Sequence, residues 1–252
     1  MLPTLRFLAA ASLLILLFQC KGPQGAATLQ PTLYNITEQT ENTLPVTESV
    51  TEMEALIAPY KAQLDEKMDR QLATVVTPLL KDSPEGGLGN WMADIMAQAG
   101  RDLYPDLDIA FAATNPGGLR LQEIAEGPLL VSEIYELMPF DNKLVVLDLT
   151  GAQVKEFLAH MANSGGWPVS EDLAVDLTSG SLNFTVNGNT LDPERSYRVV
   201  SIDYVANGGS GASMLKDKPR ITTNHFLRDI LIEYAEKTPE IDVRVTGDRW
   251  RL

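Results

Sequence analysis

DIAFAATNPGGLR, residues 108–120, joins an apolar run to a polar turn that is rich in glycine. The run Asp108 to Ala113 is typical of a buried strand, and the pair Gly117-Gly118 is typical of a tight turn after it. Asn115 and Arg120 flank that pair, so the turn carries one amide and one cation. A plain connecting turn is one interpretation, and a strand end that presents polar groups to a ligand is the other.

Helices and strands alternate irregularly on both sides of this stretch. Apolar spacing predicts helices over 52–74, from 86 to 104, over 150–161 with Thr150 as N-cap, and over 224–237. Strands are expected at 143–149, 173–177, 182–186 and 196–203, with the hairpin turn Asn187-Gly188 between the last two. The absence of a regular βαβ rhythm predicts a mixed α/β (α+β) fold, a single layered domain with mixed sheets flanked by helices.

Composition excludes several functional classes. The 252 residues are 44% hydrophobic, which is enough for a sizeable core, and 20 basic residues against 34 acidic ones give a net charge of −14. A surface this acidic repels phosphodiester backbones, so DNA or RNA backbone binding is not expected. One cysteine cannot build a disulfide framework, and two histidines cannot build a histidine-rich dinuclear metal centre.

The first 20 residues, MLPTLRFLAAASLLILLFQC, have the pattern of a secretory signal: Arg6 precedes an apolar run that is short for a bilayer span. The segment resembles a bacterial lipoprotein signal, which implies a signal peptide over 1–19 and a lipid on the sulfur of Cys20. A buried thiol in a spanning helix is the alternative. Residues 20–51 are rich in Thr, Gln, Glu and Pro, which predicts a flexible, lipid-anchored tether. The folded domain is then expected over 52–252, held at the bacterial cell envelope on the periplasmic or outer-membrane side.

Four short motifs follow one another in the expected domain. They are Gly89-Asn90 at a helix start, NPGGLR at 115–120, MPFDN at 138–142 and YVANGGSG at 204–211. Their order and spacing resemble the carboxy-terminal, substrate-specificity domain of the 5'-nucleotidase family, over about residues 53–252. That family carries Leu-Gly-Asn, Asn-x-Gly-Gly-Ile-Arg, Pro-Phe-x-Asn and an aromatic residue before Ala-x-Gly-Gly-Asp-Gly.

The resemblance implies a site for a nucleotide or nucleoside. Phe140 and Tyr204 would stack on opposite faces of the base, Asn115 would reach the base edge, and Arg120 would contact the ribose and phosphate side. Glycines would let the backbone approach the ligand closely. The full set of implied substrate-binding residues is Asn115, Gly117, Gly118, Arg120, Phe140, Asn142, Tyr204, Gly208, Gly209 and Ser210. Core packing is the alternative for the two rings, and the hypothesis fails if they lie far apart or are both sealed in the interior.

Two departures from the family pattern bear on affinity. Ser210 stands where the family has an acid that takes the ribose hydroxyls, so the site lacks that charge. Many members carry one or two arginines before the Leu-Gly-Asn helix, whereas this sequence has Lys81 as the only basic residue of the stretch 81–85. Weaker phosphate binding is therefore expected unless Lys81 compensates.

The family's hydrolytic centre, a separate metallophosphatase domain, has no match in this sequence. His160 and His225 lack the neighbours of a metal motif and are expected to be structural or exposed, and no catalytic residue, metal or cofactor is expected in this chain. The leading hypothesis is a nucleotide- or nucleoside-recognition domain that works with a separate metallophosphatase subunit in nucleotide catabolism. A solute-binding or scaffold lipoprotein of the same fold and an autonomous 5'-nucleotidase are the alternatives.

Overall fold

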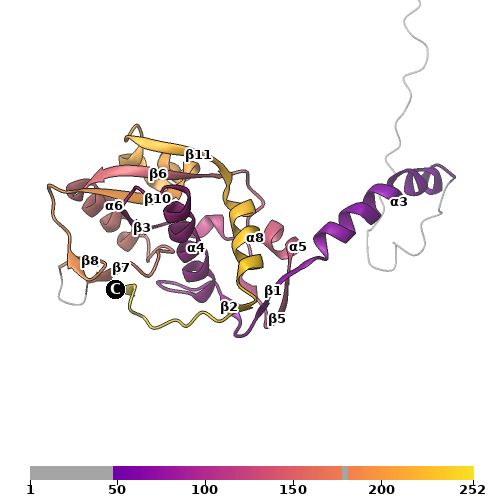
Figure 1. Cartoon of the computed structure of the whole chain (residues 1–252), viewed down its shortest axis with the longest axis horizontal. Helices are drawn as coiled ribbons and strands as arrows, with labels where there is room; N and C mark the ends of the chain where they lie inside the picture. Colours follow the sequence, from indigo (N-terminus) through magenta and orange to yellow (C-terminus); the bar gives the residue numbers. More distant parts are fainter. Residues whose placement is uncertain (1–47, 178–180) are drawn as a thin grey trace, which may run out of the picture. The chain divides into compact units, whose positions relative to one another are not determined.

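The computed structural model describes residues 48–177 and 181–252 (Figure 1). The expected signal peptide, Cys20 and the tether up to residue 47 lie outside the described residues. The chain divides into two compact units, Met1–Leu56 and Ile57–Leu252, and the second contains the elements discussed below except for the first residues of α3. No helix in the described ranges is long and apolar enough to cross a membrane.

The described elements follow one another in chain order as mixed helices and strands. The helices are α3 (Glu48–Met68), α4 (Gly87–Leu103), α5 (Val131–Leu137), α6 (Gly151–Asn163), α7 (Asp203–Ala206) and α8 (Leu227–Lys237), with short 3-10 turns η1 (Pro116–Gly118), η2 (Gly209–Gly211) and η3 (Ser213–Leu215). The strands are β1 (Gln71–Val75), β2 (Leu79–Leu80), β3 (Ile109–Ala112), β4 (Glu123–Ile124), β5 (Gly127–Leu130), β6 (Lys143–Thr150), β7 (Leu173–Asp176), β8 (Asn183–Val186), β9 (Asn189–Thr190), β10 (Ser196–Ile202), β11 (Arg220–Phe226), β12 (Glu240–Ile241) and β13 (Trp250–Arg251).

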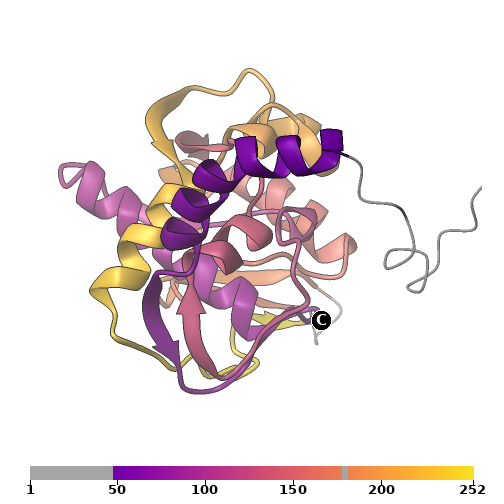
Figure 2. The ribbon, with the colours of Figure 1, turned by 90° about the vertical axis from the view of Figure 1, so that its right-hand side faces the viewer.

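The main sheet has the strand order β11-β6-β10-β3. Strand β6 is antiparallel to both neighbours, whereas β10 is parallel to β3. A second sheet has the order β12-β1-β5, in which β1 runs parallel to β12 and antiparallel to β5, and Figure 2 shows β1 and β5 side by side. Mixed sheets flanked by helices confirm the fold class expected from the sequence.

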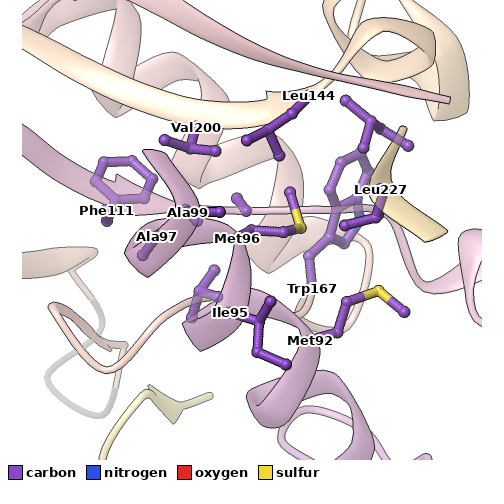
Figure 3. Packing of buried hydrophobic residues seen from close by; sticks show 14 of the residues in the cluster. Met92, Ile95, Met96, Ala97, Ala99, Phe111, Leu144, Trp167, Val200 and Leu227 are labelled. Carbon is purple, nitrogen blue, oxygen red and sulfur yellow. The ribbon is translucent and has the colours of Figure 1, made fainter. Parts of the chain in front are cut away.

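Helix α4 supplies the centre of the core. It packs against β3 and α8, and α4 and α8 run side by side below the main sheet in Figure 1. Met92 and Met96 are fully buried, and Figure 3 shows the side chain of Met96 among those of Leu144, Val200 and other buried residues. Each large side chain removed from water in this way contributes about 1.5–3 kcal/mol.

Helix α6 begins where the sequence predicts it. The backbone N–H of Gln153 donates to Thr150 Oγ1 at 3.3 Å, and Gln153 Oε1 accepts from the backbone N–H of Thr150 at 3.0 Å. This reciprocal capping box satisfies two backbone donors at the helix start and confirms Thr150 as the N-cap.

Two helix boundaries and one strand pairing predicted from the sequence are wrong for the same physical reason. Pairing with strands far along the chain overrides the local sequence pattern. The helix expected over 52–74 runs through Pro59 but ends at Met68, since residues 71–75 pair with β5 and β12. The last helix begins at Leu227 rather than 224, because residues 220–226 pair with β6. The turn Asn187-Gly188 joins β8 to the short β9, and the strand at 196–202 instead pairs with β6 and β3.

The segment around β13 is tied to the core by Arg249 and Trp250. The guanidinium of Arg249 donates to both carboxylate oxygens of Asp94 at 2.7 Å and to the carbonyl of Val169 at 2.6 Å. The indole of Trp250 donates to the carbonyl of Trp167 at 2.7 Å. Only 11% of the Arg249 side chain is exposed, so this contact fixes the segment to α4 from a largely buried position.

Candidate functional site

Three of the four sequence motifs meet at one cavity of about 360 Å³, a size in the range of small-molecule sites. The cavity lies where the turn after β3, the α5–β6 connection, α7 and η2 come together. We call it the ring cavity. Its lining consists of Asn115, Gly117, Gly118, Arg120, Phe140, Asn142, Tyr204 and Ser210.

All eight of these residues belong to the set implied by the sequence, and Gly208 and Gly209 are the two members of that set that do not line the cavity. The motif Gly89-Asn90 lies in the first turn of α4. There the buried amide of Asn90 donates to Glu85 Oε1 at 2.9 Å, which gives that motif a structural function.

The rings of Phe140 and Tyr204 line this one cavity, and neither is sealed in the interior. Phe140 is 39% exposed and Tyr204 is 48% exposed. Large aromatic side chains that face solvent across a shared hollow are available for stacking on a flat ligand. Both rings are therefore accessible from one cavity, whereas their stacking on opposite faces of one base stays a prediction.

Arg120 brings a positive charge to the ring cavity. Its Cζ lies 5.8 Å from the centroid of the Phe140 ring, and its backbone N–H donates to the carbonyl of Leu137 at 3.0 Å. Among the ion pairs of residues 48–177 and 181–252, none involves Arg120. The cation is thus placed beside an aromatic ring and is not neutralised by a carboxylate there.

The two asparagines of the site differ in exposure. Asn115 is 4% exposed, and its Oδ1 is buried without a hydrogen-bond partner among the described residues. Its amide lies under the turn, since a Cβ on Gly117 or Gly118 would come within 3.3–3.4 Å of it. Asn142 is half-buried, and its Nδ2 has only a long contact of 3.9 Å to Met138 Sδ. Asn142 is therefore the more accessible amide.

The glycine loop, which we define as residues 208–211, supports the Tyr204 side of the cavity. A Cβ on Gly209 would lie 2.5–2.6 Å from carbons of the Tyr204 ring, so only glycine lets the ring pack there. The backbone N–H of Ser210 donates to Tyr204 Oη at 3.3 Å. Gly208 has a φ of +91°, a value that glycine adopts without strain. Gly208 and Gly209 thus act by shaping the loop rather than by lining the cavity.

The Phe140 side of the cavity is held from α8. Asp141, the next residue, pairs with Arg228 at 3.0 Å, and the Arg228 guanidinium lies 4.5 Å from the ring centroid of Tyr135. The backbone N–H of Leu227 donates to the carbonyl of Asn142 at 2.9 Å. The contribution of Arg228 could not be predicted from the sequence, because a single arginine on an amphipathic helix carries no local signal of its partner.

Lys81 does not line the ring cavity. Its Nζ donates to the carbonyl of Leu119 at 2.8 Å, and the side chain borders a neighbouring hollow of about 310 Å³. The lysine therefore holds the peptide that precedes Arg120. Weaker phosphate binding stays the prediction, and this contact gives no support to Lys81 as a substitute for the missing arginines.

The two histidines lie in different surroundings. His160, on α6, has its Nε2 3.0 Å from the carbonyl oxygen of Ser210, and His225 is exposed on β11. In the described ranges no group of three or more His, Cys, Asp or Glu side chains could hold a metal ion. A dinuclear metal centre consequently does not fit this part of the chain.

Comparisons with known proteins find relatives of this chain by sequence and by structure. A segment of the protein UshA of Escherichia coli is 30% identical over 141 residues, which cover 54% of this chain and 26% of that protein. The 5'-nucleotidase precursor of Thermus thermophilus superposes with a TM-score of 0.65 at 28% identity, over 78% of this chain and 42% of that one. The NAD nucleotidase of Haemophilus influenzae, at 19% identity and a TM-score of 0.60, shares the fold.

The chain spans about a quarter of the length of the curated relatives it matches first, so it corresponds to one part of each. The family of 5'-nucleotidase C-terminal domains matches residues 72–217, which is more than half of the chain. This protein therefore belongs to the 5'-nucleotidase C-terminal domain family, a family of nucleotide catabolism.

Proposed function

We propose that the ring cavity binds a nucleotide or nucleoside and that the domain is the recognition part of a 5'-nucleotidase system. The observation that carries this proposal is the meeting of two exposed rings, Phe140 and Tyr204, with the unneutralised cation of Arg120 in one cavity. A purine has two flat faces and, as a nucleotide, one anionic end. The cavity offers a complement to each of these features.

Each group has a distinct task in this proposal. The rings stack on the base, at about 1–3 kcal/mol for each stacking partner. Arg120 forms charge-assisted hydrogen bonds with the phosphate and ribose side, worth about 1.5–3 kcal/mol. Asn115, whose Oδ1 has no hydrogen-bond partner among the described residues, contacts the base edge, with Asn142 beside it in the lining, and the hydroxyl of Ser210 bonds a ribose hydroxyl. These interactions recognise a ligand without breaking a bond in it.

Hydrolysis in this proposal is the task of a metallophosphatase subunit that supplies its own divalent metals. We also propose that Cys20 carries a lipid, so that the domain is held at the bacterial cell envelope, on the periplasmic or outer-membrane side. Several acyl chains on one residue make a stable anchor. The nucleotide would then be captured outside the cytoplasm, next to the enzyme that cleaves it.

Calorimetry of the full chain with AMP and adenosine tests the binding proposal. We expect both compounds to bind, with AMP tighter than adenosine because only AMP brings a phosphate to Arg120. The variant Arg120→Gln should remove the preference for AMP and weaken adenosine binding less, because adenosine loses only the contact on the ribose side. Absence of binding by either compound at millimolar concentration would refute the proposal.

Phosphate release separates the proposed subunit from an autonomous hydrolase. Purified chain with AMP and added divalent metal should release phosphate at the background rate, and a metal-dependent phosphatase should co-purify with the tagged protein from its host. Robust turnover by the chain alone would instead support an autonomous 5'-nucleotidase.

A solute-binding or scaffold lipoprotein is the second candidate, favoured by Ser210 and Lys81. Ser210 gives the cavity no acid, and Lys81 is engaged with a backbone carbonyl rather than with the cavity. That candidate predicts a ligand other than a nucleoside. Competition by ligands without a flat ring system, measured against AMP, distinguishes it from the leading proposal.

The substitution Ser210→Asp should strengthen adenosine binding about fivefold. A carboxylate accepts hydrogen bonds from both ribose hydroxyls, and a charged acceptor contributes about 1 kcal/mol more than a neutral one. Aspartate also tolerates the left-handed backbone of residue 210, where φ is +52°. Titration of adenosine against wild type and variant measures the effect.

2′,3′-Dideoxyadenosine, which lacks the 2′ and 3′ hydroxyls of the ribose, is the matched control ligand. Its affinity should not rise in Ser210→Asp, and the gain for AMP should be smaller than for adenosine because the new carboxylate repels the phosphate. An equal gain for adenosine and dideoxyadenosine would contradict a contact between residue 210 and the ribose.

A further inference from the structure

His160 makes a specific contact with the glycine loop from outside the ring cavity. Its Nε2 lies 3.0 Å from the carbonyl oxygen of Ser210. A carbonyl oxygen only accepts, so Nε2 carries the hydrogen in this contact. The imidazole also packs edge-on against Trp167, with ring centroids 5.4 Å apart and planes at 77°. Trp167 is 2% exposed, so the imidazole rests on a fixed part of the core.

The loop is shaped to receive this imidazole. Gly211 has a φ of +79°, and a Cβ there would come within 3.0 Å of His160 Cε1. A side chain at 211 would therefore require His160 or the loop to shift by a few tenths of an ångström, in addition to the strain of a positive φ. The absence of a side chain at this position leaves room for the imidazole beside the carbonyl of Ser210.

Ser210 itself needs support from its surroundings. It is one of three residues other than glycine with positive φ in the described ranges, and its φ of +52° lies in the left-handed region that disfavours L-residues. Its peptide groups are held from two sides, the N–H by Tyr204 Oη at 3.3 Å and the carbonyl by His160 at 3.0 Å. The backbone of Ser210 is thus hydrogen-bonded on one side to the Tyr204 ring and on the other to His160 of α6.

We propose that His160 is a positioning residue for ligand binding in the ring cavity. It holds Ser210 in the left-handed conformation that aims the Ser210 side chain into the cavity and places Tyr204 Oη against the loop. The effect on affinity rests on the proposed nucleoside binding, whereas the effect on the loop does not. His160 lines neither side of the cavity, so it acts through the loop alone.

Two substitutions of His160 separate a hydrogen bond from mere bulk. In His160→Gln the side-chain amide can donate to the Ser210 carbonyl, whereas in His160→Leu nothing can donate. Adenosine affinity should fall about threefold to tenfold in the leucine variant and stay within about twofold of wild type in the glutamine variant. Equal affinity in leucine variant and wild type, or equal losses in both variants, would overturn the proposal.

A second readout uses the free protein and needs no ligand. In ¹⁵N spectra of wild type and both variants, the amide signals of Gly209, Ser210 and Gly211 should move and exchange faster with solvent in His160→Leu, and remain near wild type in His160→Gln. Unchanged loop signals in His160→Leu would overturn the positioning function even if nucleosides bind. Conversely, if the loop signals change in His160→Leu but wild type binds no nucleoside, the positioning function of His160 stands and only the proposed function is refuted.

Gly211→Ala and His225→Leu complete the design. Gly211→Ala leaves His160 intact but is expected to move the loop away from it, so this variant should weaken adenosine binding as His160→Leu does. It takes the place of His160→Leu in the test if the leucine variant fails to fold. The second removes the exposed histidine of β11 and should change neither the affinity nor the loop signals. Wild-type affinity in Gly211→Ala would count against the proposal.

Discussion

Phe140→Ala is expected to weaken the binding of AMP and adenosine by about 5- to 150-fold, which corresponds to the loss of one stacking partner worth about 1–3 kcal/mol. The ring is 39% exposed and lines the cavity, so a base that covers it removes apolar surface from water. The variant also removes the ring beside the Arg120 guanidinium. Calorimetric titration of wild type and variant measures the difference.

The opposite ring gives the same test from the other side of the ligand. Tyr204→Ala should cause a loss of similar size, because each ring would cover one face of the base. Tyr204→Phe keeps the ring and removes only the oxygen that accepts from Ser210, so its loss should stay below about tenfold. Ribose 5-phosphate has no flat face, and its affinity should not depend on either ring.

Tyr60→Ala is the control for this pair of variants. Tyr60 lies on α3, is 72% exposed and does not line the ring cavity, so its removal should leave affinity unchanged. Retained wild-type affinity in both Phe140→Ala and Tyr204→Ala would remove the physical basis of the proposed function.

Arg249→Met is expected to lower the free energy of unfolding by about 1.5–3 kcal/mol. The arginine is largely buried and donates to both oxygens of Asp94 and to the carbonyl of Val169, whereas Asp94 is one-third exposed and keeps the Glu171 N–H as a donor. Urea unfolding measures the change, and the melting temperature should fall by about 3–12 °C for a domain of this size.

Arg251→Met offers a matched comparison two residues away. Arg251 pairs with Asp248, but both side chains are more than half exposed, so solvent screens the pair and its loss should lower the free energy of unfolding much less than the loss of Arg249 does. Equal destabilisation by the two variants would show that charge count, rather than the buried contact of Arg249, stabilises the segment.

The features that the sequence predicts well are those with a local cause. Helix α6 follows from its apolar spacing and the cap at Thr150, and both are contained within a few neighbouring residues. The gathering of Asn115, Arg120, Phe140 and Tyr204 is not local, but each sits in a short motif whose order is typical of one family. A family resemblance supplies long-range information that periodicity alone lacks.

The features that escaped prediction depend on partners far along the chain. Residues 71–74 and 224–226 fall within the helices predicted over 52–74 and 224–237, and they lie in strands because β5, β12 and β6 offer backbone partners. His160 and Arg228 are single residues without a motif, and their contacts with Ser210 and Asp141 arise only after folding. No window of the sequence contains both members of such a pair.

The short strands β12 and β13 have a consequence for how the protein is made. β12 pairs with β1 and β13 with β7, so residues 240–251 complete two sheets whose other strands are translated much earlier. Until residues 240–251 are in place, the edges of β1 and β7 lack these partners and expose unpaired backbone groups. Folding is therefore completed only when this late segment pairs, and a chaperone that shields those edges until then would protect the protein from aggregation.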